Sequence, residues 1–413
     1  MAEELTVSFL VVCARTDPPT PEAVRRAFTA AGLGSADYVA AGARSPLEAM
    51  GRHRLGMYTL TTQGLPAQAR YTIYRSDDPV TEGMSETAFA RLTRGLSVAD
   101  VATMRDGPLA FDARLSVDAR MIVPALDWLM RTLRFFAETT GGVAVDPACQ
   151  RCLGPTELAQ FQGATAAAHI VIHNEFQGGE DRWIHTHGLQ KFGRPELEFV
   201  AVPQALESEA LAFLRAMAEN FARGVTLTSG QEIRDEEAGA LLAVGSNQDT
   251  DHQAPQSRLR LIDLPAPGER ESSSARRFLA RMALGEAARY AHAGDSAQSY
   301  ATIDRILSAN ADDSAALLLK AQINLREGRP LDALELGEIL CLRVPSDFRG
   351  YLMVAFALSA LGRQREALNA LNTAIKQEPE SAEVFAKRAE VYERLGEGKL
   401  AAYDRAHAAH LRM

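Results

Sequence analysis

The sequence predicts an α+β part with a mixed or largely antiparallel sheet and helices, followed by an all-α superhelix of helical repeats. Three observations predict this fold class. The chain has 413 residues, which is too long for one hydrophobic core. Its first two thirds mix short runs of alternating apolar residues with amphipathic segments. Its last third repeats glycine and small residues every 34 positions.

Seven segments before residue 264 have the composition of β-strands, and three have the apolar spacing of helices. We expect strands at 6–12, 56–62, 70–74, 110–115, 143–145, 169–175 and 197–202, which are β-branched, aromatic or alternating. We expect helices at 21–31, 121–139 and 207–223. The favoured arrangement is a sheet covered by helices on one face. An open α/β sheet is the alternative, because helices and strands alternate along the chain.

Composition and charge exclude several classes of protein. Apolar residues make up 46% of the chain and charged residues 23%, which is typical of folded proteins. The net charge of -9 argues against binding to nucleic acid, which requires clustered lysine and arginine. The N-terminus is acidic, unlike a secretion signal, and no run approaches the ~20 apolar residues that cross a membrane. The sequence therefore predicts a cytoplasmic protein with neither nucleic-acid nor membrane partners.

Glycine marks a regular period in the last third of the chain. Gly294, Gly328, Gly362 and Gly396 recur every 34 residues, and glycine suits the left-handed turn that ends a helix. Small residues recur seven positions before each glycine and five positions after it, where they let two helices approach closely. These are Ala287, Ala321, Ala355 and Ala389 before the glycines, and Ser299, Ala333, Ala367 and Ala401 after them.

Proline completes this pattern. Pro345 and Pro379 stand 17 positions after Gly328 and Gly362, where a second helix must end. Period, small residues, turn glycine and proline together resemble the tetratricopeptide repeat (TPR) family. The resemblance implies four helical hairpins at 276–413, stacked into a superhelix whose concave face binds a protein or peptide. A polar linker at 265–275 would join them to an α+β domain at 1–264.

The concave face that the resemblance implies is apolar or neutral, unlike the charged clamps of TPR proteins that bind chaperone tails. We expect it to suit the apolar stripe of an amphipathic helix, or a segment of the front domain; the alternative is that these residues only pack helix on helix. The last hairpin has no polar capping helix after it, so we expect it to pack on the front domain or on another copy. The groove positions are Leu284, Leu318, Gln322, Leu352 and Phe356.

Four of the nine histidines lie between residues 169 and 187. In the strand expected at 169–175, alternation places His169 and His173 on one face and Ile170 and Ile172 on the other. If the isoleucines face the core, the histidines are exposed. Gly178 and its neighbours predict a hairpin turn after this strand.

His185 and His187 are also two residues apart, so an extended segment offers both imidazoles to one side. That geometry can hold zinc or another divalent metal, with Glu175 or Glu196 as a further ligand. The alternative is a tight corner in which the imidazoles hydrogen-bond the backbone and Gly188 supplies an unusual backbone angle. The surrounding segments 183–189 and 192–198 resemble a stretch of uncharacterised bacterial domains, a resemblance that implies no activity.

Cys149 and Cys152 form a second candidate site. With His185 and His187 they would complete a four-ligand zinc site. A redox couple is another interpretation, but Pro155 interrupts the helix that such a couple needs after its first cysteine. The remaining interpretation is that both are ordinary loop cysteines.

The sequence favours a protein-interaction scaffold over an enzyme, because it holds no phosphate loop, dinucleotide fingerprint or nucleophile elbow. In this hypothesis the repeats bind a partner, and the α+β domain recognises a partner or ligand. Two alternatives remain. One is a metal-dependent enzyme or zinc-stabilised domain that uses His185 and His187, and the other is a thiol-redox protein that uses Cys149 and Cys152.

Overall fold

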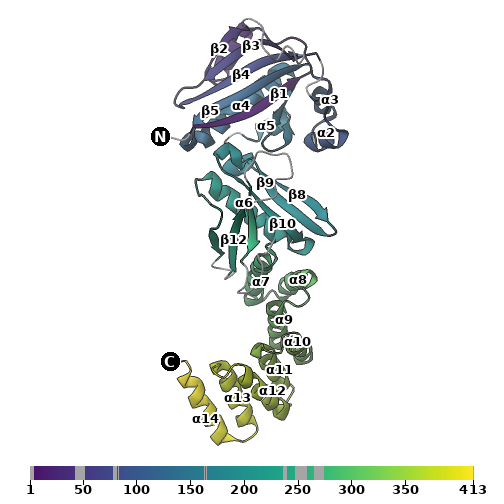
Figure 1. Cartoon of the computed structure of the whole chain (residues 1–413), viewed down its shortest axis with the longest axis vertical. Helices are drawn as coiled ribbons and strands as arrows, with labels where there is room; N and C mark the ends of the chain where they lie inside the picture. The colour runs from purple at the N-terminus through teal and green to yellow at the C-terminus, as the bar shows by residue number, and fades with distance from the viewer. Residues whose placement is uncertain are drawn as a thin grey trace.

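A computed structural model describes residues 4–41, 52–77, 81, 83–161, 163, 165–235, 240–246, 258–264 and 274–412. It has three parts, stacked along the longest axis of the molecule (Figure 1). A seven-stranded sheet comes first, a six-stranded sheet follows, and α-helices alone make up the rest. The predicted fold class, an α+β part followed by an all-α part, is confirmed. Most of the predicted linker, and the predicted loop at 247–257, lie outside the described residues.

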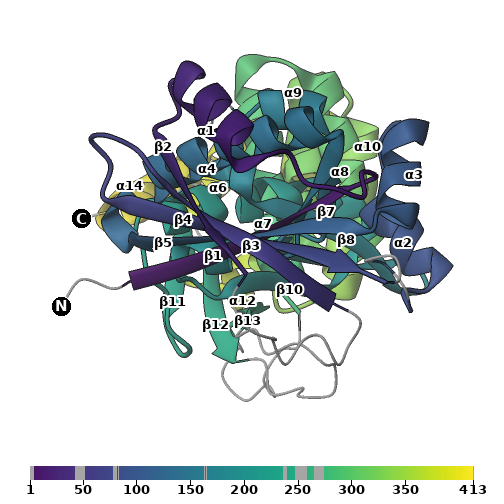
Figure 2. The same ribbon diagram turned by 90° about the horizontal axis from the view of Figure 1, so that it is seen from above.

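The first sheet is antiparallel throughout, in the order β2-β3-β4-β5-β1-β6-β7. Helices α1 and α4 cover one face (Figure 2). The alternating residues Val7, Phe9 and Val11 point to that face and pack with Phe28 of α1 and Phe136 of α4. The strands are β1 (Glu4–Cys13), β2 (Ser35–Ala40), β3 (Arg52–Thr61), β4 (Ala67–Ser76), β5 (Leu109–Asp118), β6 (Gly142–Asp146) and β7 (Arg151–Leu153), and the helices are α1 (Pro21–Ala30), α2 (Glu86–Leu92), α3 (Val98–Asp106), α4 (Ile122–Thr140) and α5 (Pro155–Ala159).

The second sheet runs in the order β11-β12-β13-β10-β9-β8 and is mixed, because β10 and β13 are parallel. Helix α6 (Glu207–Ala222) covers one face, where Leu197 and Phe199 pack with Leu214. The opposite face carries polar side chains, including the histidines discussed below. The strands are β8 (Val171–Gly178), β9 (Asp181–His187), β10 (Glu196–Pro203), β11 (Glu232–Asp235), β12 (Ala240–Ser246) and β13 (Arg258–Asp263); short 3-10 helices η3 (Ala166–His169) and η4 (Leu189–Phe192) flank the hairpin of β8 and β9.

The remaining helices form four hairpins. Each hairpin turns at one of the four glycines, whose φ angles lie between 73° and 82°, a left-handed conformation that a side chain would strain. The small residues that recur around the glycines are buried between the helices. The helices are α7 (Arg276–Ala293), α8 (Ser296–Ala309), α9 (Ser314–Arg326), α10 (Pro330–Arg343), α11 (Phe348–Ala360), α12 (Gln364–Gln377), α13 (Ala382–Arg394) and α14 (Gly398–His410).

The first hairpin packs directly against the second sheet. Phe278 and Leu279 of α7 share one core with Phe213 of α6 and Leu261 of β13. The ring centroids of Phe213 and Phe278 are 5.0 Å apart. In the parts of the chain that are described, no helix is long and apolar enough to cross a membrane.

Candidate metal centre

The hairpin of β8 and β9 brings three histidines together on the polar face of the second sheet. It turns at Gly178 and Gly179, both with positive φ, and the resulting register places His173 opposite His185. His187 follows two residues after His185 on the same face of β9. The sheet thus joins the predicted pair, His185 and His187, with His173 from the neighbouring strand.

The three imidazoles are close enough to share an ion. One ring nitrogen of each histidine lies within 4.8 Å of one ring nitrogen of each of the other two. Among the described residues, no other three His, Cys, Asp or Glu side chains come this close together. The ring centroid of His187 lies 4.5 Å from that of His173 and 4.9 Å from that of His185. Nitrogens bound to one tetrahedral zinc ion are about 3.3 Å apart, so small side-chain rotations would close the site.

Two of these histidines are buried, and each has one ring nitrogen without a hydrogen-bond partner. His185 is 2% exposed and His187 3% exposed, and neither Nδ1 atom has a hydrogen-bond partner. Burying a polar atom without a partner is costly, and native proteins rarely do so without a reason. Burial, together with the charge of Arg258, lowers the pKa of His185 to about 2; burial, His173 and Arg258 lower that of His187 to about 3. Both rings are therefore neutral at pH 7, the form that binds metals.

His173 is the outermost of the three. It is half-buried; burial lowers its pKa, and the nearby carboxylate of Glu175 opposes that effect. Glu175 Oε1 lies 3.8 Å from His173 Nδ1 and 3.1 Å from Nη1 of Arg91 on α2. A carboxylate beside a metal-binding histidine fixes the orientation of its ring. Figures 1 and 2 show α2 and α3 together at one end of the first sheet, near β8.

Trp183 and Glu198 support the site from the other side. The indole ring of Trp183 stacks on His185 with centroids 3.9 Å apart, and its Nε1 donates to Glu198 Oε2 at 3.0 Å. Glu198 also accepts a 2.8 Å hydrogen bond from Arg260 Nε. Arg258 lies 5.1 Å from the Trp183 ring. The ring of His185 is therefore held by packing and by charge pairs.

His169 does not lie on the same face as His173, which corrects the expected alternation. Residues 166–169 form η3, and the strand begins only at Val171. The ring of His169 is fully buried beside Phe161, and both of its nitrogens lack a partner. The histidines that do share the face are not exposed, because the connection between β6 and β7 covers them: the backbones of Ala148 and Cys149 hydrogen-bond His187 and His173.

Glu196 lies at the end of the hairpin and is occupied by other groups. It accepts hydrogen bonds from Thr186 Oγ1 at 2.7 Å and from the backbone N–H of Gly188 at 2.8 Å and of Gln190 at 3.3 Å. Burial raises its pKa, and these hydrogen bonds oppose that effect. The structure thus places Glu196 where it shapes the turn after His187.

The two cysteines of the predicted pair lie in different surroundings. Cys149 Sγ contacts Lys191 Nζ at 3.2 Å and the carbonyl oxygen of His169 at 3.1 Å. Cys152 belongs to β7 and packs in a small apolar core with Phe89 and Met104. Burial raises the pKa of each thiol to about 12, whereas redox cysteines have lowered pKa values. Neither cysteine is among the side chains that converge with the histidines.

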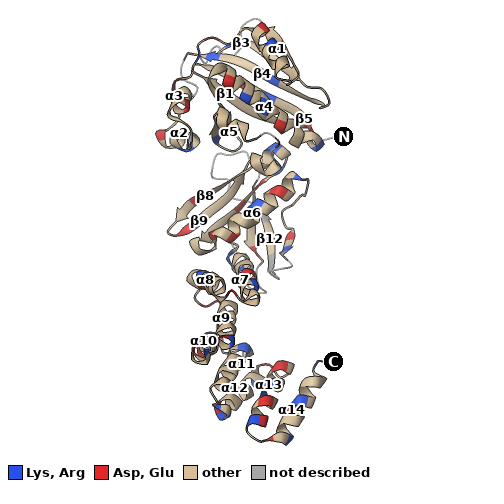
Figure 3. Ribbon diagram, turned by 180° about the vertical axis from the view of Figure 1, so that it is seen from behind, with Lys and Arg blue, Asp and Glu red and all other residues tan. Residues whose placement is uncertain are grey.

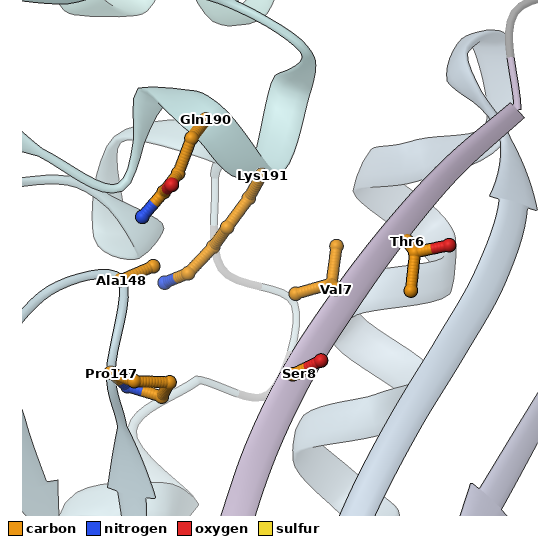
Figure 4. Close-up of a pocket in the computed structure, with 7 residues that line it drawn as sticks. All are labelled: Thr6, Val7, Ser8, Pro147, Ala148, Gln190 and Lys191. Atoms are coloured by element: carbon orange, nitrogen blue, oxygen red, sulfur yellow. The ribbon is translucent and has the colours of Figure 1, made fainter. Parts of the chain in front are cut away.

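Lys191 joins the two sheets and was not anticipated from the sequence. It extends from η4 toward Ala148 at the edge of a cavity of about 260 Å³ (Figure 4). Its Nζ lies 2.5 Å from Asp146 Oδ2 and donates to the His169 carbonyl at 3.1 Å. Burial raises the pKa of Asp146, but the charges of Lys191 and Arg151 outweigh burial and lower it overall.

The residues predicted to line the groove of the repeats differ in accessibility. Leu318 and Leu352 are buried between helices, and Leu284 and Phe356 are half-buried. The Phe356 ring lies 4.4 Å from Lys387 Nζ on α13. Gln322 is exposed on α9. Acidic and basic residues alternate on the neighbouring α13 and α14 (Figure 3).

In comparisons with known proteins, the segment that holds the histidine hairpin is similar to a family without a known function. A family model described as the C-terminal part of a protein of unknown function (DUF4026) matches residues 169–251, which include all three histidines. This agrees with the resemblance of 183–198 to uncharacterised domains. No curated protein matches the chain.

Several solved structures are similar to part of the chain. A thermophilic TPR protein of Thermus thermophilus is 27% identical, with a TM-score of 0.31, over 32% of this chain and 74% of its own. MamA of MSR-1 is 20% identical, with a TM-score of 0.28, over 32% of this chain and 76% of its own. A double mutant of MamA of RS-1 is 19% identical, with a TM-score of 0.29, over 33% of this chain and 82% of its own.

Proposed function

We propose that this chain is a metal-binding protein whose α+β part holds a divalent ion, most simply zinc, through His173, His185 and His187. The observation that carries this proposal is that three imidazoles converge, and that two of them, His185 and His187, are buried and each keep one ring nitrogen without a hydrogen-bond partner. Neutral imidazole is a preferred ligand of zinc, and a bound ion would satisfy all three rings at once. Glu196, Cys149 and Cys152, the other ligands expected from the sequence, are not part of this proposal.

The proposal can be tested by the effect of zinc on unfolding. A ligand that binds only the folded state stabilises it by about 2.7 kcal/mol at 100 times its Kd. Both tryptophans, Trp128 and Trp183, lie in the α+β part, so fluorescence reports the unfolding of that part alone. We expect zinc to raise the denaturant midpoint of the chelator-treated full chain.

The variants make this test specific. His185→Ala should abolish the effect of zinc. His53→Ala is the matched control, because His53 is exposed on β3 beside Asp77. An equal response of the parent chain and His185→Ala to zinc would rule out the proposed ligands.

A second candidate function is protein interaction through the helical repeats. Its support is the exposed apolar surface of α14, the last helix, where Leu400 is 47% exposed and Tyr403 is 69% exposed. We propose that this surface pairs with a second copy, and that the inner helices accept an amphipathic helix beside Phe356. Light scattering of the full chain should then show a dimer that Tyr403→Glu converts to a monomer. A monomeric parent chain would exclude the self-association.

A further inference from the structure

The three histidines leave a bound ion short of one ligand. Zinc in proteins has four ligands in tetrahedral geometry, and a site with three protein ligands keeps one position for water or another molecule. In the described part of the chain no fourth His, Cys, Asp or Glu converges with His173, His185 and His187. The chemistry around the site therefore decides what takes this position.

The nearby carboxylates are already engaged. Glu175 pairs with Arg91 at 3.1 Å. Glu198 accepts from the Trp183 indole at 3.0 Å and from Arg260 at 2.8 Å. Glu196 accepts from Thr186 and from two backbone N–H groups. Moving any of these carboxylates onto the ion would break hydrogen bonds that are charge-assisted or buried.

One neighbouring cation has hydrogen-bonding capacity to spare. Arg258 on β13 is largely buried, and its Nη1 has no hydrogen-bond partner among the described residues. The nearest carboxylate oxygen, Glu198 Oε2, is 3.9 Å away, beyond hydrogen-bonding distance. Arg258 lies 5.1 Å from the centroid of the Trp183 ring, which stacks on His185 with ring centroids 3.9 Å apart. A buried guanidinium nitrogen without a partner is a donor suited to an oxyanion.

The charges around the site favour an anion. Beside the histidines, Arg91 pairs with Glu175, and Arg258 and Arg260 lie next to Glu198. These side chains carry no net negative charge that could offset the two positive charges of a divalent ion. In a partly buried site such an excess of charge attracts a ligand of opposite sign strongly.

We propose that the metal ion at this site carries an external oxyanion, a phosphate or carboxylate group, that also accepts a hydrogen bond from Arg258. This inference rests on the proposed metal site and names the class of its ligand. Arg91 and Glu175 are both more exposed than His185, so we expect the anion to enter from their side. A free anion and the acidic group of a larger molecule would use the same contacts.

Cobalt provides a test, because Co²⁺ takes zinc sites and its visible absorption bands change with its ligands. The chelator-treated full chain is loaded with Co²⁺ and titrated with inorganic phosphate and, separately, with acetate. We expect the cobalt absorption bands to appear on loading. At least one of the two anions should then shift these bands until the shift saturates, and the anion that does so shows whether the ligand group is a phosphate or a carboxylate. Arg258→Gln should keep the bands and weaken anion binding about tenfold or more.

Two controls separate the possible failures. Arg105→Gln, which removes an exposed arginine paired with Glu86 on α2, should bind the anion like the parent chain. Cobalt bands that neither anion shifts, or a shift that Arg258→Gln leaves unchanged, would overturn the anion site and leave the metal site standing. A parent chain without cobalt bands would overturn both. If Arg258→Gln loses the bands as well, Arg91→Gln serves as the second variant, and it too must weaken anion binding.

Discussion

Replacing Lys191 with methionine should destabilise the α+β part more than any change to an exposed charge. The side chain of Lys191 is 1% exposed, and its Nζ lies 2.5 Å from Oδ2 of Asp146, whose side chain is fully buried. Methionine fills a similar volume and leaves the Asp146 carboxylate without its nearest cation. Breaking a buried ion pair by removing one partner costs about 3–5 kcal/mol, because the remaining charge stays desolvated. Arg151 Nε, 3.4 Å from the same oxygen, remains, so we expect the lower end, about 3 kcal/mol.

The assay is denaturant unfolding of the full chain followed by the fluorescence of Trp128 and Trp183. Lys191→Met should lower the free energy of unfolding of the α+β part, and adding Asp146→Asn should restore part of the loss by removing the stranded charge. Arg26→Met is the matched control, because Arg26 pairs with Glu22 on the surface of α1 and should leave the transition unchanged. A loss below about 1 kcal/mol for Lys191→Met, or a double variant less stable than the single one, would refute this reasoning.

Three further predictions concern the repeats, the buried histidine and the thiols. Gly396→Ala should lower the stability of the full chain by about 1 kcal/mol, because the φ of Gly396 is 82° and a side chain strains that conformation. Gly398→Ala is the control: Gly398 lies in open space at the start of α14, so alanine there should be neutral or stabilising. Thermal unfolding followed by circular dichroism measures both variants. Burial and the charge of Lys191 lower the folded pKa of His169 to about 3, so the unfolded chain takes up the proton first as the pH falls below about 6.5. Between pH 6.5 and 5.5 the free energy of unfolding of the parent chain should therefore fall by about 1 kcal/mol more than that of His169→Phe. Denaturant titrations measure both, and equal falls would contradict the assigned burial of His169. Cys149 and Cys152 should react with a thiol reagent only after denaturation, because burial raises the pKa of each thiol to about 12. Fast labelling of both cysteines in the native chain would contradict this and support a redox function.

Elements with a strong period could be predicted from the sequence, and short ones could not. The 34-residue spacing of glycine predicts the eight helices from α7 to α14, and apolar spacing predicts α1, α4 and α6. The helices α2 and α3 were missed because they have seven and nine residues, too few for a clear period. A signal for both exists, since Ser85 and Ser97 accept hydrogen bonds from the backbone as N-caps.

The metal centre could be predicted only in part. The two-residue spacing of His185 and His187 points to one face of a strand, as the structure has it. Their partner His173 could have been found by counting back from the predicted turn at Gly178 and Gly179, because hairpin register follows from the turn. Strand alternation alone instead places His173 on one face with His169, and the structure differs because η3 holds His169 outside the strand.

The burial of Lys191 could not be predicted, because lysine is almost always exposed unless a charged partner accompanies it. That partner, Asp146, lies 45 residues earlier, in the other sheet. Only the packing of the two sheets brings them together. The same packing covers the histidines with the backbone of Ala148 and Cys149, which is why the exposure expected for them from strand alternation was wrong.

The metal content of the purified chain shows whether His173, His185 and His187 hold an ion. Elemental mass spectrometry is done on the full chain, made without a histidine tag and purified without chelator, beside His185→Ala and the control His53→Ala. We expect about one zinc or other divalent ion per chain in the parent and the control, and none in His185→Ala. A parent chain that holds no metal after exposure to excess zinc, or a His185→Ala variant that retains it, would contradict the tri-histidine site.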